Sequence, residues 1–187
     1  GNPDLVVTNG HVDDLRQLDQ PYRMRSQFFR NTGSGHYVEL QPNTLGAYFK
    51  REVLGRGMAR LDYDGDGRVD VAISHLESPV SLLANRTPEP GQFLAVRLVA
   101  TSTSRDAIGT RVTVRRGAWR RSRQLTAGDG YLASNQRQLV FGLGSHVTLD
   151  ELTVEWPSGH STRWQDVSAG REVVVVEGRG RLIELPR

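Results

Sequence analysis

The segment Asp62-Tyr63-Asp64-Gly65-Asp66-Gly67-Arg68-Val69-Asp70 constrains this chain most, because it places four aspartates within a short stretch. Carboxylates at its first, third, fifth and ninth positions repel one another strongly unless a cation lies between them. Calcium takes about six to eight oxygen ligands, and two glycines let the backbone curl around it. The sequence therefore predicts a calcium site. The expected metal ligands are the carboxylates of Asp62, Asp64, Asp66 and Asp70 and the backbone carbonyl of Arg68.

The residues around this segment predict strands rather than helices. A helix-loop-helix calcium site needs an acidic residue at its twelfth position and a helix on each side. Ile73 occupies that position here, and the short apolar stretches 57–61 and 69–74 are typical of strands. We therefore expect a strand-loop-strand site in which Asp70 replaces the usual glutamate. The alternative is a solvated acidic turn without a bound ion.

Part of this pattern occurs twice in the chain. Residues 1–8 align with residues 67–74, at an offset of 67 − 1 = 66, with Gly and Asp at the same spacing before an apolar run. Residues 28–32 and 82–86 form a second echo, in which two apolar residues and a spacer precede an asparagine suited to a turn. A repeat of this length with about four short strands has the size of a propeller blade.

The best domain boundary is Thr87-Pro88-Glu89-Pro90-Gly91, because two prolines and a glycine cannot continue a central strand. We expect an incomplete β-propeller over 1–88 and a separate β domain over 91–187. Beyond residue 92 the apolar residues alternate with polar ones, which predicts half-buried strands in a sandwich or barrel. Two apolar runs, 139–141 and 173–176, predict strands covered on both faces. The predicted fold class is all-β.

Residues 1–85 resemble the FG-GAP or VCBS-type repeats of calcium-binding β-propellers, through the aspartate segment, its truncated copy at Gly1-Asn2-Pro3-Asp4, and Phe29-Arg30-Asn31-Thr32-Gly33-Ser34-Gly35. The remainder resembles the ASPIC/UnbV domain that follows such repeats in relatives of cartilage acidic protein. The motifs that carry this second resemblance are Arg105-Asp106-Ala107-Ile108-Gly109-Thr110-Arg111-Val112, Ala127-Gly128-Asp129-Gly130-Tyr131-Leu132, Phe141-Gly142-Leu143-Gly144 and Val154-Glu155-Trp156-Pro157-Ser158-Gly159.

These resemblances imply a secreted or cell-surface protein, extracellular or periplasmic, that uses calcium for adhesion or recognition of a protein or glycan and has no catalytic activity. They also imply that this chain is the C-terminal fragment of a longer protein, whose upstream region would carry a signal peptide and further repeats. Asp4 and the carbonyl of Asn2 would belong to a second calcium site, whose other ligands would precede Gly1.

Enzymatic interpretations find little support in the sequence. The chain has no cysteine, which excludes thiol nucleophiles and cysteine-ligated zinc. Its five histidines are scattered, and Ser158 lacks the Gly-x-Ser-x-Gly elbow of a hydrolase nucleophile. The alternative function that stays open is an accessory domain of a secreted hydrolase whose active site lies upstream.

Arginines are concentrated in one stretch of the second half. The chain has a formal net charge of +3, but no acidic residue lies between Asp106 and Asp129. These arginines are expected to form an ordinary solvated surface, and the alternative is a polyanion contact at Arg115, Arg116, Arg120, Arg121 and Arg123. No nucleic-acid motif surrounds these arginines, and no apolar run reaches the roughly 20 residues that span a bilayer.

Overall fold

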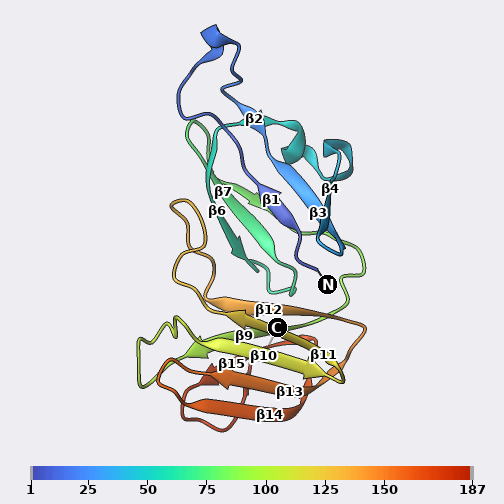
Figure 1. The fold of residues 1–187 in the computed structure, drawn as a ribbon, viewed down its shortest axis with the longest axis vertical. Coiled ribbons are helices and arrows are strands. Elements are labelled where there is room, and N and C mark those ends of the chain that lie inside the picture. Colours follow the sequence, from blue (N-terminus) through green and yellow to red (C-terminus); the bar gives the residue numbers. More distant parts are fainter. Residues whose placement is uncertain (1, 186–187) are drawn as a thin grey trace. The chain divides into compact units, whose positions relative to one another are not determined.

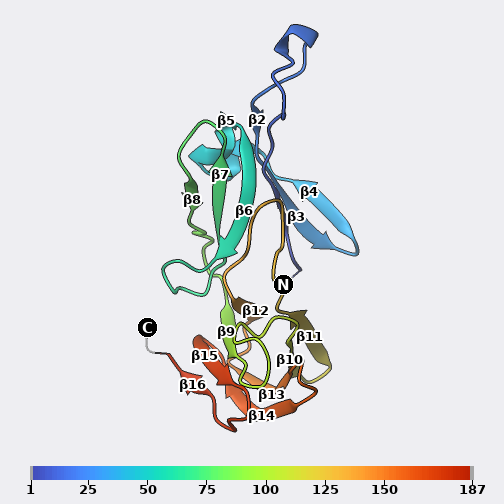
Figure 2. The ribbon, with the colours of Figure 1, turned by 90° about the vertical axis from the view of Figure 1, so that its left-hand side faces the viewer.

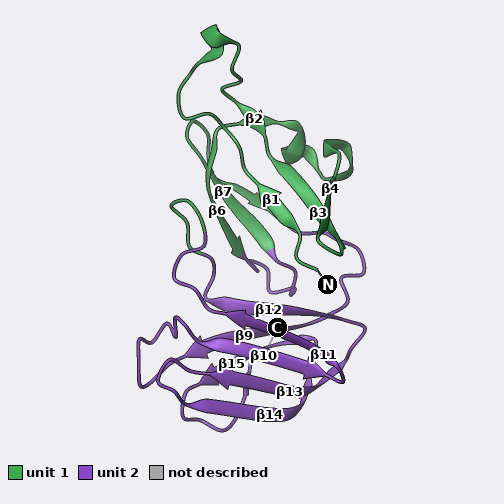
Figure 3. Ribbon diagram, viewed as in Figure 1, with its two compact units in different colours: residues 1–60, 70–84, 130–134 green, residues 61–69, 85–129, 135–187 purple. Residues whose placement is uncertain are grey.

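The computed structural model describes residues 2–185, which form an all-β fold, as predicted. The chain divides into two compact units (Figure 3). The first comprises residues 1–60, 70–84 and 130–134, and the second residues 61–69, 85–129 and 135–187. Relative to the expected ranges 1–88 and 91–187, the segment 61–69 therefore groups with the second unit and the segment 130–134 with the first.

The first unit contains two three-stranded sheets and a two-stranded ribbon (Figures 1 and 2). One sheet has the order β1 (Leu5–Val7), β3 (Gln27–Gly33), β4 (His36–Glu39). The other has the order β6 (Gly55–Leu61), β7 (Asp70–His75), β8 (Ser81–Leu83). The ribbon pairs β2 (Met24–Arg25) with β5 (Glu52–Val53).

Three short 3-10 helices complete this unit: η1 (Arg16–Leu18), η2 (Pro42–Thr44) and η3 (Ala47–Lys50). The longest of them has four residues. Within residues 2–185, no helix has the length and hydrophobicity that a membrane crossing requires.

The internal repeat seen in the sequence is also a repeat of strand pairing. At the offset of the first echo β1 corresponds to β7, and at that of the second echo β3 corresponds to β8. Both pairs are antiparallel and have the same register: Leu5 faces Phe29 and Val6 faces Phe28 in one, as Val71 faces Leu83 and Ala72 faces Leu82 in the other. Each of the two sheets therefore contains an equivalent strand pair, one from each copy of the repeat.

The asparagines of the repeat make matching hydrogen bonds. Asn31 donates from Nδ2 to the Pro3 carbonyl at 3.0 Å, and Asn85 donates to the corresponding Val69 carbonyl at 3.3 Å. Each asparagine also accepts, at Oδ1, the backbone N–H two residues further along, at 2.9 Å and 3.1 Å. The asparagine side chain thus ties the end of the second strand to the start of the first in both copies.

Aromatic side chains of η3 connect these two sheets. Tyr48 and Phe49 pack in the cluster formed with buried Val53 and Ile73. The Phe49 ring also meets the Phe28 ring of β3 edge-on, with centroids 6.5 Å apart. The Phe49 ring therefore joins Phe28 of the first copy to the core cluster that contains Ile73 of the second copy.

The second unit consists of two four-stranded sheets. Their orders are β11-β10-β13-β14 and β12-β9-β15-β16. The strands of the first sheet are β10 (Arg111–Arg116), β11 (Trp119–Gln124), β13 (Thr148–Glu155) and β14 (Ser161–Ser168). Those of the second are β9 (Gln92–Val99), β12 (Gln138–Gly144), β15 (Arg171–Val176) and β16 (Ile183–Glu184). The pair β9–β15 is parallel, and the other pairs of this unit are antiparallel.

Alternating residues from both sheets form one hydrophobic core, which makes this unit a sandwich. Leu94 and Val96 of one sheet and Val112 and Val114 of the other are fully buried in it. No closed barrel forms among the strands of residues 2–185. The runs 139–141 and 173–176 both alternate between buried and half-buried residues, so the expectation of full cover on both faces was wrong for both strands. Their apolar outer residues are partly accessible because sheet β12-β9-β15-β16 has its core on one face.

Candidate metal centre

The aspartate segment connects two neighbouring strands, as predicted. β6 ends at Leu61 and β7 begins at Asp70 in the sheet β6-β7-β8. Gly65 and Gly67 have φ angles of 74° and 83°, in the left-handed region that glycine adopts without strain. A Cβ atom on Gly67 would lie 2.2 Å from the ring of Phe93, whereas one on Gly65 would meet nothing within 4 Å. The loop therefore needs glycine at Gly67 for its surroundings as well as its backbone.

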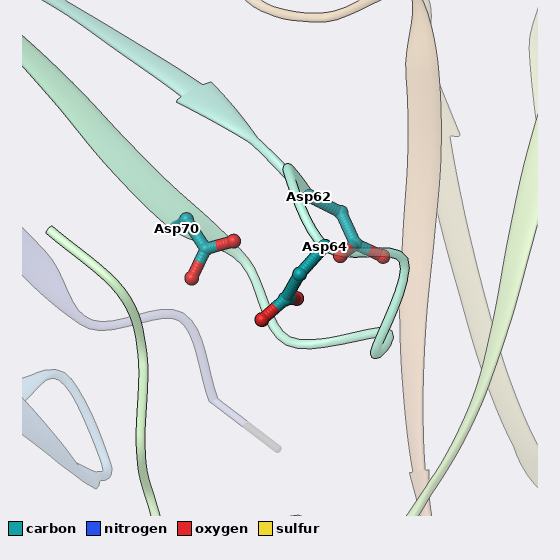
Figure 4. Close-up of side chains that lie close together, drawn as sticks. All are labelled: Asp62, Asp64 and Asp70. Atoms are coloured by element: carbon teal, nitrogen blue, oxygen red, sulfur yellow. The ribbon is translucent and has the colours of Figure 1, made fainter. Parts of the chain in front are cut away.

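Three carboxylates of the segment converge, those of Asp62, Asp64 and Asp70 (Figure 4). One oxygen from each lies within 4.8 Å of the others. A calcium ion about 2.3–2.6 Å from each ligand can bridge oxygens up to about 5 Å apart. Asp70 is 1% exposed, Asp62 is half-buried and Asp64 is exposed. Oxygen donors alone, partly shielded from water, fit a hard cation such as calcium.

Asp66 is oriented differently from these three. Its carboxylate accepts the backbone N–H of Arg68 and the Arg68 Nε–H, both at 2.8 Å. Burial raises the pKa of Asp66, but the hydrogen bonds from Arg68 outweigh it, so that the pKa lies below its ordinary value. The Arg68 side chain also donates to the Thr87 carbonyl at 2.9 Å. The metal-ligand roles predicted for the Asp66 carboxylate and the Arg68 carbonyl stay predictions.

Hydrogen bonds within the second unit hold the loop in place. Asp62 accepts the Gly67 N–H at Oδ2, at 2.9 Å, and donates its own backbone N–H to Gln136 Oε1 at 2.7 Å. Arg86 donates to Asp64 at 2.9 Å and to the Tyr63 hydroxyl oxygen at 3.1 Å. The hydrogen bond to Asp64 is the main reason that the pKa of Arg86 is raised. Positive charge therefore already lies beside the exposed aspartate of the cluster.

Sequence reasoning missed two residues of this arrangement. Arg86 directly follows Asn85 in the second echo of the repeat, so the repeat weakly indicated that it lies near the loop. Gln136 lies 74 residues from Asp62, and no sequence pattern indicated that the two residues are in contact. Both hydrogen-bonding partners depend on the tertiary structure of the second unit.

Asp4 occupies the place in the first copy that Asp70 has in the second. Its Oδ1 accepts the backbone N–H of Asn31 at 2.8 Å. Asn2 is exposed, while Gly1 lies outside the described residues. The second calcium site expected at Asn2 and Asp4 stays a prediction.

A different polar cluster of the second unit surrounds Glu177, which is 2% exposed. Its carboxylate accepts the backbone N–H groups of Thr101 and Ser102, at 2.8 and 2.9 Å, and the hydroxyl of Ser158. The Ser158 hydrogen bond is the main reason that the pKa of Glu177 lies below its ordinary value, followed by the two backbone donors. Ser158 thus donates to a buried carboxylate that joins a loop to a turn.

Two comparisons with known proteins bear on these expectations. Residues 100–182 match the family model described as ASPIC and UnbV. The chain is also 34% identical over 111 residues to cartilage acidic protein 1 of Xenopus tropicalis, an alignment that covers 56% of this chain. The chain spans 16% of the length of that relative. The FG-GAP or VCBS-type repeats expected over 1–88 stay a prediction, whereas the resemblance of the second half to ASPIC and UnbV proteins is supported by the match at residues 100–182.

Proposed function

We propose that this chain is part of a calcium-stabilised recognition or adhesion module that acts outside the cell and has no catalytic activity. The observation that carries the proposal is the convergence of Asp62, Asp64 and Asp70 on the loop between β6 and β7. A cation there would relieve the repulsion among their charges and hold the two strand ends together. Calcium would therefore act on stability rather than on a reaction.

The repeated strand pair supports a structural role for the loop. Asp70 begins β7 in the second copy, and Asp4 directly precedes β1 in the first. Both copies share their strand register and their asparagine hydrogen bonds. A ligand-bearing loop before the same strand of each copy is expected of a repeat in which calcium stabilises every unit.

The recognition role and the extracellular location rest on the second unit. Its residues 100–182 match the ASPIC and UnbV family, and the relative is called a cartilage acidic protein. Calcium sites with exposed ligands such as Asp64 suit the millimolar calcium of extracellular fluids, where affinities of about 10⁻⁴–10⁻³ M suffice.

Calorimetric titration of the metal-free protein with calcium tests this proposal. We expect Asp62→Asn and Asp64→Asn each to weaken calcium binding by at least about tenfold, because each substitution removes one charged ligand from the cluster. Asp66→Asn should weaken it less, since Asp66 is not one of the three converging carboxylates and instead accepts two hydrogen bonds from Arg68. Asp19→Asn, an exposed acid in a left-handed backbone position, is a matched control that should leave binding unchanged.

Two results would contradict the proposal. Equal losses in the Asp19 variant and the cluster variants would mean that calcium responds only to net charge. Hydrolytic turnover by the full-length protein would favour the alternative, an accessory domain of a secreted hydrolase. For the recognition role, the full-length protein should adhere to extracellular matrix in calcium and detach when EDTA is added.

A further inference from the structure

The six arginines of the β10–β11 hairpin differ in what surrounds them. The acidic strand β13 lies on one side of β10, and its Asp150 carboxylate contacts Arg116 at 2.5 Å and Arg115 at 3.8 Å. Glu151 lies 4.0 Å from Arg115, and Glu155 lies opposite Arg111 in the register. The acids of β13 therefore balance the arginines of β10.

Strand β11 forms the edge of this sheet and pairs with β10, not with the acidic strand β13 (Figure 1). Arg120 faces Arg115 directly across the strand pair, a like-charge arrangement that is unfavourable on its own. Within residues 2–185, no ion pair joins Arg120 or Arg121 to a carboxylate. Positive charge therefore accumulates along the exposed edge strand.

Two arginines of this strand lie within cation–π distance of aromatic rings. The Arg121 guanidinium carbon lies 5.8 Å from the centroid of the Trp119 ring, and that of Arg123 lies 5.8 Å from the centroid of the Phe141 ring. A cation–π contact engages the face of the guanidinium rather than the N–H groups in its plane. It also restricts the arginine side chain before a ligand arrives, which reduces the entropy cost of binding.

We propose that the edge strand β11 binds an extended sulfated polysaccharide through Arg120, Arg121 and Arg123. Arg121 and Arg123 project from one face of the strand, about 6.6–6.8 Å apart, and Arg120 projects from the other. Because β11 is an edge strand, long side chains from both faces reach a chain that runs along it. Each guanidinium can donate two parallel hydrogen bonds to the oxygens of one sulfate group.

Other polyanions fit this surface less well. Single-stranded nucleic acid needs exposed aromatic rings for base stacking, but Phe141 is 2% exposed and Trp119 is half-buried. An acidic peptide that adds a strand to a sheet edge takes its specificity from pockets for alternate side chains. Residues 120–124 of β11 are all exposed and do not form such pockets. A sulfated polysaccharide needs only charged groups along its length.

This site goes beyond the proposed function and is independent of it. Its three arginines belong to the second unit and lie outside the calcium-site segment 62–70. Glycan binding should therefore not require calcium, and it is measured in EDTA. Glycan binding that persists without calcium supports the site whether or not the calcium proposal holds. Failure of calcium binding and failure of glycan binding are therefore separate results.

The test is fluorescence anisotropy with a labelled heparin dodecasaccharide, over a range of sodium chloride concentrations. We expect Arg120→Gln/Arg121→Gln/Arg123→Gln to weaken binding about tenfold at about 0.15 M salt. The slope of log affinity against log salt should decrease by about three, because three arginines no longer neutralise sulfate groups. The control Arg105→Gln/Arg179→Gln/Arg181→Gln removes the same charge at exposed positions elsewhere in the unit and should change neither quantity.

The corresponding triple lysine variant keeps the positive charge. It is a control for the possibility that the glutamine variant loses binding because it misfolds. It should bind heparin more weakly than the natural chain, because an ammonium group cannot make the paired hydrogen bonds, and more tightly than the glutamine variant. Hyaluronan, which carries carboxylates but no sulfate, should bind poorly.

Four results would overturn the proposal. The first is an equal loss of heparin affinity in the test and control variants, and the second is hyaluronan binding as tight as heparin binding. The third is tighter binding of oligoglutamate or single-stranded DNA than of heparin. The fourth is unchanged heparin affinity in a glutamine variant that self-associates, which would mean that the arginines only protect the sheet edge from pairing with other chains.

Discussion

Gly65 and Gly67 offer a matched pair of substitutions that tests how the aspartate loop is held. Their φ angles are similar, 74° and 83°, but a Cβ atom would be free at Gly65 and would clash with Phe93 at Gly67. Alanine in the left-handed region costs about 1–2 kcal/mol. Overpacking against a buried ring adds about 1–3 kcal/mol. We therefore expect Gly65→Ala to lower the free energy of unfolding by about 1–2 kcal/mol and Gly67→Ala by roughly 2–5 kcal/mol.

Urea unfolding followed by tryptophan fluorescence measures this difference. The chain's three tryptophans, Trp119, Trp156 and Trp164, all lie in the second unit, which also contains both glycines. EDTA in the buffer separates the packing effect from any effect of calcium. Equal destabilisation by the two substitutions would refute the close approach of Gly67 to Phe93 as a determinant of the loop.

Three further predictions follow from other parts of the structure. Glu177→Gln should lower the melting temperature at neutral pH, because the charged carboxylate accepts three hydrogen bonds. The pKa of Glu177 is lowered from its ordinary 4.5, so the stabilisation by its carboxylate is present above that pH and is lost as the pH falls through the folded-state pKa. The melting temperatures of the natural chain and of the Glu177→Gln variant should therefore converge in acid. Phe141→Ala should lower the free energy of unfolding in urea by about 3–5 kcal/mol, because this ring is 2% exposed and the substitution leaves a cavity; a loss below about 1 kcal/mol would contradict its place in the core. Asn85→Ala should increase amide hydrogen exchange between residues 69 and 87 by up to about tenfold, because it removes the hydrogen bonds with Val69 and Thr87; unchanged exchange would mean that they do not stabilise the loop.

The strands and the repeat were predictable because they depend on local pattern. Alternation of apolar residues identified the strands around Val96 and Val114, which form the sandwich core. The spacing of Gly and Asp before an apolar run identified the strand pair shared by the two copies. These features need no knowledge of distant residues.

The side-chain arrangement of the loop was less predictable. Sequence spacing treated Asp64 and Asp66 alike, but Arg68 engages Asp66 through two hydrogen bonds, while Asp64 lies with Asp62 and Asp70. Competition between an arginine and a metal for one carboxylate depends on rotamers, which spacing does not determine.

Long-range partners were also hidden from the sequence. The hydrogen bond between Asp62 and Gln136 joins residues 74 positions apart. The strand register separates the arginines that the sequence had grouped, because Arg115 and Arg116 face the acids of β13 whereas Arg120 and Arg121 belong to the edge strand. Strand order decides this division, and strand order is a property of the whole sheet.

A crystal structure of the protein grown in calcium, with the anomalous signal of the ion recorded, tests the central claim most directly. The account predicts one anomalous peak between Asp62, Asp64 and Asp70, with an oxygen of each about 2.3–2.6 Å away. A protein saturated with calcium that shows no peak there, or whose aspartate side chains point away from a common centre, would contradict it.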